Sequence, residues 1–261
     1  MLANRLTRIY GIVAIAIVWE VVSRLEILPS QFFPPLSTVL MALWETLFSE
    51  SVWRDEALTI GRALSGVAVA AGIGITLAVA ASSSEVFDAM LAPIVELLRP
   101  IPPAAMIPIS IFFLGIGKEL FLFTIAFASV WPIYVSTANA LNSVDRVLID
   151  TGRSFGCGRL EELILIRFPV ALPEIFTGLR VGIGIAFLAT IVVEMLAGRG
   201  GIGFQLFDSA FSLQIPLMFA FVIIAGINGS VLNWVTNQVR YLLTAWHLGL
   251  SRQLSASHPA E

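Results

Sequence analysis

The residue types that could do chemistry are concentrated in one polar run between Val147 and Gly178. Within it, Asp150, Gly156, Ile166 and Pro169 stand at the spacing D-x5-G-x9-I-x2-P. The only cysteine, Cys157, can form no internal disulfide, and a small residue in a helix turn explains it more simply than a thiol or metal site. Charged groups and an unpaired backbone cannot rest in lipid, so this run must lie in water. We therefore expect it to contact a partner rather than to catalyse a reaction.

Two short helices are expected in this run. Asp145 or Asp150 can begin the first helix, because acidic residues stabilise a helix N-terminus. The glycines around Cys157 permit a sharp bend, and a second helix is predicted over Arg159–Ile166. Pro169 and Pro173 are then expected to stop this helix and to start the next apolar segment. Such a pair of helices would make a rigid knob able to transmit force to the membrane.

The composition assigns the remaining chain to the membrane. Hydrophobic residues make up 57% of the 261 residues and charged residues 13%, about half the share of charge in a soluble domain. We expect an all-α, polytopic bundle of about six transmembrane helices. The predicted spans are Ile9–Leu28, Leu58–Ala81, Ala104–Ile116, Leu120–Leu141, Ile175–Ala197 and Pro216–Leu243.

Two further features of the sequence concern the third predicted span and the segment between the first two spans. The third span is short, but it continues a helix-compatible stretch from Phe87 that prolines interrupt at residues 100–103, which indicates a kink or a re-entrant turn. An amphipathic stretch over Thr38–Phe48 follows Ser37, a candidate N-cap.

Positive charge predicts the orientation of the chain. With six spans and a cytoplasmic N-terminus, basic residues are in excess on the inside, and the polar run is cytoplasmic. The inside residues are Arg5, Arg8, Arg99, Arg146, Arg153, Arg159, Arg167, Arg240 and Arg252, and the outside residues are Arg24, Arg54, Lys118 and Arg199.

At this point the chain resembles the membrane subunits of ABC importers. Their cytoplasmic signature has the form E-A-A-x3-G-x9-I-x-L-P, and here the corresponding residues are Asp150-Thr151-Gly152, Gly156 and Ile166-Arg167-Phe168-Pro169. The spacing is kept, whereas Asp, Thr-Gly and Phe replace Glu, Ala-Ala and Leu. The segment from Leu98 to Gly117, which contains Arg-Pro-Ile-Pro-Pro, is similar to the nitrate, sulfonate, taurine and bicarbonate branch of these permeases.

The resemblance implies a type I importer permease that takes up a small anionic solute, such as nitrate, a sulfonate or taurine, and hydrolyses nothing itself. It implies one transmembrane domain over residues 1–261, with a core at about 55–245 and a coupling loop at 145–173. ATP and Mg would bind a partner ATPase in the cytoplasm. The other implied partners are an extracytoplasmic solute-binding protein, a second permease copy and the lipid of a bacterial or archaeal inner membrane, with no nucleic acid. The coupling residues would be Asp150, Thr151, Gly152, Arg153, Ser154, Phe155, Gly156, Cys157, Gly158, Arg159, Ile166 and Pro169.

Four residues within the spans are candidates for the solute pathway or a gate: Glu194, Asn139, Asn228 and Arg180. A charged group inside a span is costly and is a functional hypothesis by default. For Glu194 a structural or gating role is favoured over solute contact, and the asparagines could equally bond across helices. Arg180 could meet an anionic solute at the inner mouth of the cavity or could anchor the helix at the interface. The alternative class is a secondary transporter independent of ATP, although the sequence shows no inverted repeat.

Overall fold

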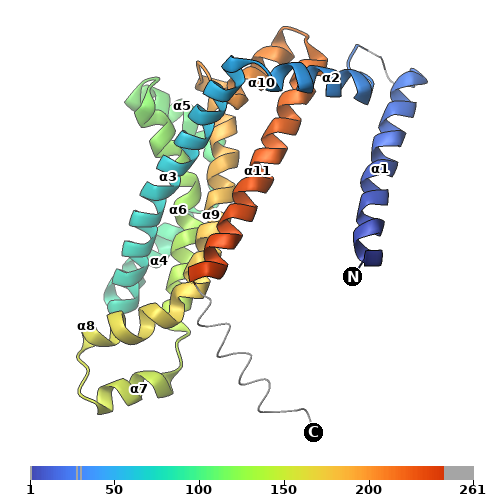
Figure 1. Cartoon of the computed structure of the whole chain (residues 1–261). Helices are drawn as coiled ribbons and strands as arrows, with labels where there is room; N and C mark the ends of the chain where they lie inside the picture. The colour runs from blue at the N-terminus through green and yellow to red at the C-terminus, as the bar shows by residue number, and fades with distance from the viewer. Residues whose placement is uncertain (1, 28, 30, 244–261) are drawn as a thin grey trace. The chain divides into compact units, whose positions relative to one another are not determined.

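All the regular secondary structure is helical over the residues that the computed structural model describes, namely 2–27, 29 and 31–243 (Figure 1). Arg252 and the last part of the predicted core, residues 244–245, lie outside this range. The described part of the chain contains no strand, which confirms the expected all-α class. The helices are α1 (Leu2–Arg24), α2 (Leu36–Leu47), α3 (Glu50–Ser83), α4 (Glu85–Leu98), α5 (Pro103–Leu114), α6 (Lys118–Asn142), α7 (Arg146–Ser154), α8 (Arg159–Glu161), the π-helix η1 (Glu162–Arg167), α9 (Phe168–Ala197), α10 (Ile202–Phe211) and α11 (Ile215–Leu243).

Four of the described helical segments are long and apolar enough to cross a membrane: α3, α6, the continuous stretch Arg159–Ala197 and α11. The pair α4 and α5 passes the same test together and is bent by 98° at the proline-rich break. This bend confirms the interruption predicted at residues 100–103. Helix α1 overlaps the first predicted span over Ile9–Arg24, and its passage through the membrane stays a prediction.

The proline stop predicted at the end of the polar run is wrong. Helix α9 begins at Phe168, contains Pro173 in its interior and follows η1 without a break. Pro169 is the second residue of α9 and lies inside the continuous helical stretch Arg159–Ala197. The wider turns of the π-helix directly before it change the hydrogen-bonding register, so that the chain continues as a helix.

The chain divides into two compact units. Unit 1 comprises the residues up to Thr59 together with Glu194–Asn228, and unit 2 comprises Ile60–Val193 and the chain from Gly229 onward. The predicted single domain over the whole chain stays a prediction.

Unit 2 is built on close contacts between α3, α6 and α9. Gly66 of α3 leaves the space that the Ile125 side chain of α6 occupies, and a Cβ at Gly74 would lie 3.1 Å from the carbonyl oxygen of Val130. Such contacts bring two helix backbones together, as small residues do in membrane bundles. Gly72, which the same helix carries, has open space around it. Apolar side chains complete this packing in two clusters, centred on Ala78, Ala81, Val95 and Tyr134 and on Ala140, Leu141, Ala171 and Ile175.

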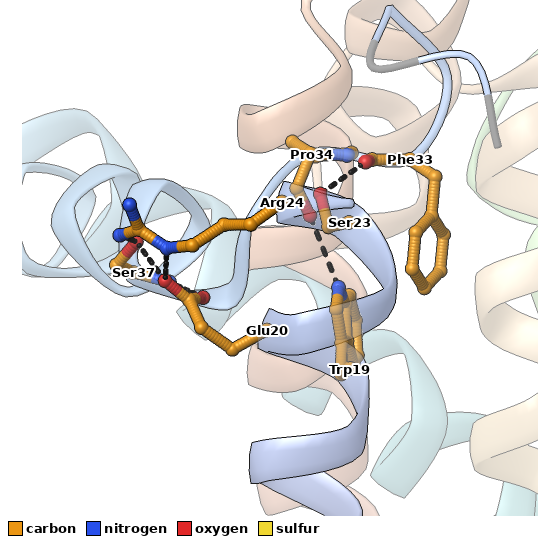
Figure 2. A network of polar contacts seen from close by, with 7 residues as sticks. All are labelled: Trp19, Glu20, Ser23, Arg24, Phe33, Pro34 and Ser37. Atoms are coloured by element: carbon orange, nitrogen blue, oxygen red, sulfur yellow. Dashed lines mark hydrogen bonds and ion pairs between the residues drawn. The ribbon is translucent and has the colours of Figure 1, made fainter. Parts of the chain in front are cut away.

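In unit 1, polar contacts fix the junction of α1 and α2 (Figure 2). The Glu20 carboxylate accepts hydrogen bonds from the backbone N–H and the hydroxyl of Ser37, at 3.0 and 2.9 Å, and from Nε of Arg24 at 2.7 Å. The predicted N-cap role of Ser37 is therefore wrong: α2 begins at Leu36, and a carboxylate from α1 satisfies the N–H group of Ser37 instead. Trp19 adds a hydrogen bond from Nε1 to the carbonyl of Pro34 at 3.0 Å.

A buried polar cluster holds the turn between α9 and α10, also in unit 1. Thr59 Oγ1 donates to the Glu194 carboxylate, at 2.9 Å from Oε2, and accepts from the Ile202 N–H at 2.9 Å. Glu194 Oε2 also accepts from the Gly203 N–H at 3.0 Å. Asp55 Oδ1 accepts from the Gly201 N–H at 2.7 Å. Three α3 and α9 side chains thus satisfy the first N–H groups of α10, which would otherwise be unpaired in an apolar interior.

Substitution of Gly66 with alanine should destabilise the bundle, because the added Cβ would overlap the branched part of the Ile125 side chain. Overpacking of this kind costs about 1–3 kcal/mol. Gly72→Ala is the matched control on the same helix, since a Cβ there meets nothing within 4 Å. Thermal unfolding in detergent measures both variants, and equal midpoints for the two would contradict the packing.

Substitution of Thr59 with valine should lower stability by about 1–3 kcal/mol, because it leaves buried polar groups of Glu194 and Ile202 with one partner fewer. Thr190→Val is the control. Thr190 is equally buried, at 0% exposure, but its hydroxyl only donates to the Ala186 carbonyl of its own helix. The same unfolding assay applies, and a loss of stability in Thr190→Val as large as in Thr59→Val would rule out the cluster as the cause.

Candidate functional site

The first helix of the predicted coupling loop, α7, is closed at both ends by local hydrogen bonds. Asp145 caps its N-terminus by accepting from the Val147 N–H at 2.9 Å. At its C-terminus the Gly156 N–H donates to Arg153 O at 2.9 Å and the Cys157 N–H donates to Gly152 O at 3.1 Å. This pair of bonds is a Schellman motif, which requires a left-handed residue, and Gly156 supplies it with φ of +88°. The turn predicted at Gly156 is therefore present in the structure.

The second helix of the loop begins directly after this turn. The Gly158 N–H donates to Glu161 Oε2 at 2.9 Å, so a side chain in the first turn caps the new helix. Helix α8 passes into η1 and then into α9 without interruption. Figure 1 shows α7 and α8 together at one end of unit 2, beyond the ends of α6 and α9.

A buried carboxylate ties the two helices of the loop together. Glu162 is 3% exposed, and its Oε2 accepts from Arg153 Nε of α7 at 2.9 Å. Its Oε1 accepts from Arg167 at the end of η1, at 2.7 Å from Nε and 2.6 Å from Nη2. Ile166 adds an apolar contact, because its Cδ1 lies where a side chain on Gly152 would begin. The Glu162 side chain is the buried member of these pairs, and loss of its arginines would leave its charge uncompensated, whereas the Arg153 side chain is 56% exposed.

The sequence reasoning did not single out Glu162. Arg167 is five residues from Glu162, a spacing that puts two side chains on different sides of an α-helix. In the π-helix η1, with its i to i+5 hydrogen bonds, the two side chains meet. Asp150, the acidic residue of the predicted signature, is exposed, and its backbone carbonyl accepts from the Ser154 hydroxyl at 2.9 Å.

The loop also presents apolar side chains to its surroundings. We call Val147, Leu148, Phe155 and Leu160 the docking face. Phe155, at the turn after α7, is 86% exposed, and both Val147 and Leu160 are 68% exposed. Val147, Leu148 and Phe155 are spaced so that they share one side of the helical turns. Exposed apolar groups amid charged residues mark a surface for a partner. Of the remaining predicted coupling residues, Thr151, Arg153, Ser154, Gly158 and Arg159 are exposed, whereas Cys157 and Pro169 are half-buried.

The four predicted pathway residues have different surroundings. Glu194, in unit 1, is 0% exposed, and its contacts with Thr59 and Gly203 support a structural role. Asn228, also in unit 1, donates to Glu56 Oε2 at 2.8 Å. In unit 2, the side chain of Asn139 is exposed.

Arg180 is the fourth of these residues and lies in unit 2. Its Nε donates to Asn233 Oδ1 at 2.7 Å, and its Nη1 donates to Asn237 Oδ1 at 3.5 Å. The sequence reasoning did not single out Asn237, although its spacing of four residues from Asn233 places both amides on one side of a helix.

Known proteins resemble this chain in sequence and in fold. It is 29% identical over 252 residues to the taurine transport system permease protein TauC of Escherichia coli, covering 94% of this chain and 92% of TauC. It is 30% identical over 220 residues to the bicarbonate transport system permease protein CmpB of Synechocystis sp., covering 77% of this chain and 75% of CmpB.

Among solved structures, the fold matches a chain of the MetNI methionine ABC transporter in an inward-facing conformation. The TM-score is 0.60 at 18% identity, with 74% of this chain and 94% of that chain covered. Residues 70–246, more than half of the chain, match the family described as binding-protein-dependent transport system inner membrane component. This chain therefore belongs to that family, the membrane permeases of ABC importers.

Proposed function

We propose that this chain couples ATP hydrolysis on a cytoplasmic partner to the import of a small oxyanion, with α7 and its docking face as the contact. The observation that carries this proposal is an exposed apolar face on a loop whose interior is locked by Glu162. A loop can transmit a force to the transmembrane helices only if the loop itself is rigid. Here η1 continues directly into α9, so a displacement of the docked loop acts on a transmembrane helix.

The charge around the loop supports a cytoplasmic position. Arg153, Arg159 and Arg167 lie within or beside it, and positive residues favour the cytoplasmic side of a membrane. With the predicted number of spans, this position also places the N-terminus in the cytoplasm. The solute-binding protein would then meet the opposite side of the membrane.

The relatives indicate the class of solute. TauC is named for taurine, CmpB for bicarbonate, and a further relative, NrtB of Synechocystis sp., is named as a nitrate import permease. Taurine carries a sulfonate, so the three solutes share a small group of oxygens around a central atom, with negative charge on the oxygens. We propose a solute of this class for the present chain.

The functional unit that we propose contains two copies of the permease. Closed two-fold assembly is the commonest arrangement of identical subunits. Each copy would present one docking face to an ATPase subunit, which would bind ATP and Mg. The permease itself would supply the solute pathway and would hydrolyse nothing.

Phe155→Asp should release the ATPase from the permease, because it places a charge at the most exposed side chain of the apolar docking face. We expect at least about a tenfold loss of ATPase subunits that co-purify with the tagged permease, the scale of a disrupted interface hot spot. Phe211→Asp is the control, since Phe211 is a similarly exposed aromatic residue, at 76%, outside the loop. If no ATPase accompanies the unmodified chain, or if reconstituted vesicles import solute without ATP, the proposal fails.

Gly156→Val should uncouple ATP hydrolysis from uptake while leaving membrane insertion intact. A β-branched residue is strained at φ of +88°, at a cost of roughly 1–3 kcal/mol, so the turn that orients α7 is lost. Gly115→Val is the matched control outside the loop, because Gly115 also has a positive φ, +70°, and has open space around it. The measurement is solute imported per ATP hydrolysed in proteoliposomes. Equal ratios in the two variants would argue against the coupling role of this turn.

A further inference from the structure

Arg180 is a cation held in place by two neutral side chains within unit 2. Its Nε donates to Asn233 Oδ1 at 2.7 Å, and its Nη1 lies 3.5 Å from Asn237 Oδ1. The two asparagines are one helical turn apart on α11, so they present their amides on the same side. Since both bonds use the guanidinium as the donor, the amide oxygens orient Arg180 without neutralising it.

The contacts of α9 with α6 show which side of α9 carries Arg180. Gly178 and Gly182 lie against α6, where Ser136 and Ile133 occupy the space next to them. Arg180 is two residues from each glycine, a rotation of about 200° that places it on the opposite side of α9. Phe187, seven residues later, returns to the same side and lies 3.6 Å from a Cβ built on Gly229 of α11. The seam between α9 and α11 is therefore apolar at Phe187 and polar at Arg180.

The charge of Arg180 has no counter-ion in the part of the chain that the structure describes, where no carboxylate lies within ion-pair distance of it. Arg153 and Arg167, by contrast, share Glu162. A guanidinium has five N–H donors, and the two asparagines occupy two of them. Arg180 is only half-buried, so the remaining donors are accessible.

The position of Arg180 makes exposure to lipid costly. Arg180 is the thirteenth residue of α9, about 18 Å along a helix that is apolar enough to span the membrane. A charge within such an apolar stretch is costly in hydrocarbon and is more stable facing water or a polar ligand. The side of α9 and α11 that carries Arg180 would therefore face an aqueous path.

We propose that Arg180, oriented by Asn233 and Asn237, binds the oxyanion group of the solute as it passes through the permease. This inference rests on the proposed function and adds to it the residue that binds the solute and the side chains that orient that residue. Guanidinium groups bind planar and tetrahedral oxyanions through parallel N–H bonds, and a carboxylate partner would compete for the same donors. The neutral amides of Asn233 and Asn237 orient the guanidinium group, and its positive charge stays available to the solute.

Asn233→Asp tests the inference with almost no change in shape. The new carboxylate keeps the acceptor for Arg180 Nε but neutralises the guanidinium, so a merely structural contact would be preserved or strengthened. We expect ATP-driven uptake of radiolabelled taurine or isotopically labelled nitrate, supplied with the cognate binding protein, to fall by about tenfold or more. Gln238→Glu, which adds the same charge at an exposed position of α11, is the control and should import at the unmodified rate.

Arg180→Lys and Arg180→Gln complete the series. Lysine keeps the charge without the fork and should retain part of the uptake, whereas glutamine should retain none beyond background. Undiminished uptake by Asn233→Asp or by Arg180→Gln overturns the inference, as does loss of the assembled complex in Asn233→Asp. If the unmodified complex imports neither taurine nor nitrate, the proposed class of solute is wrong. Absence of the ATPase from that complex is a separate result, which concerns the proposed function alone.

Discussion

A charged or polar group that is shielded from water must find a partner, and the burial of Glu162 is the point at which this constraint shapes the loop. The carboxylate is 3% exposed and lies between Arg153 of α7 and Arg167 at the end of η1. Helix α7 could not hold its position alone, because it has only nine residues, whereas α8 is continuous with η1 and α9. The ion pair between Arg153 and Glu162 joins α7 to this continuous helix, whose apolar length is anchored in the bundle. The ion pairs of Glu162 therefore keep the docking face rigid, although α7 is short.

The same constraint separates structural charges from functional ones in this chain. Asp55 and Glu194 are buried in unit 1 and accept N–H groups from the start of α10, so their oxygens serve the fold. Glu20 serves the start of α2 in a similar way. Arg180 differs, because the groups around it orient the cation and leave its charge without a counter-ion among the described residues. The positive charge of Arg180 is therefore available to bind a solute.

Local signals in the sequence predicted local structure well. The prolines at residues 100–103 indicated the break between α4 and α5, and the glycine at position 156 indicated the turn after α7, because both effects depend on the backbone of a few residues. The proline stop at Pro169 failed because a π-helix directly before it changed the hydrogen-bonding register. Contacts such as that between Asp55 and Gly201 join residues 146 positions apart, and no local spacing records them.

The departures from the importer signature also have physical explanations in the contacts of the loop. Gly152 stands where that signature has alanine, and the end of the Ile166 side chain occupies the space of the missing methyl group. An alanine at this position would displace Ile166 from α7, so glycine permits the closer approach of η1. Asp150 stands where the signature has glutamate, yet it is exposed, and the ion pairs of the loop belong to Glu162. The spacing of the signature is kept because it sets the turn and the helix register, whereas the residue types can change where another side chain supplies the contact.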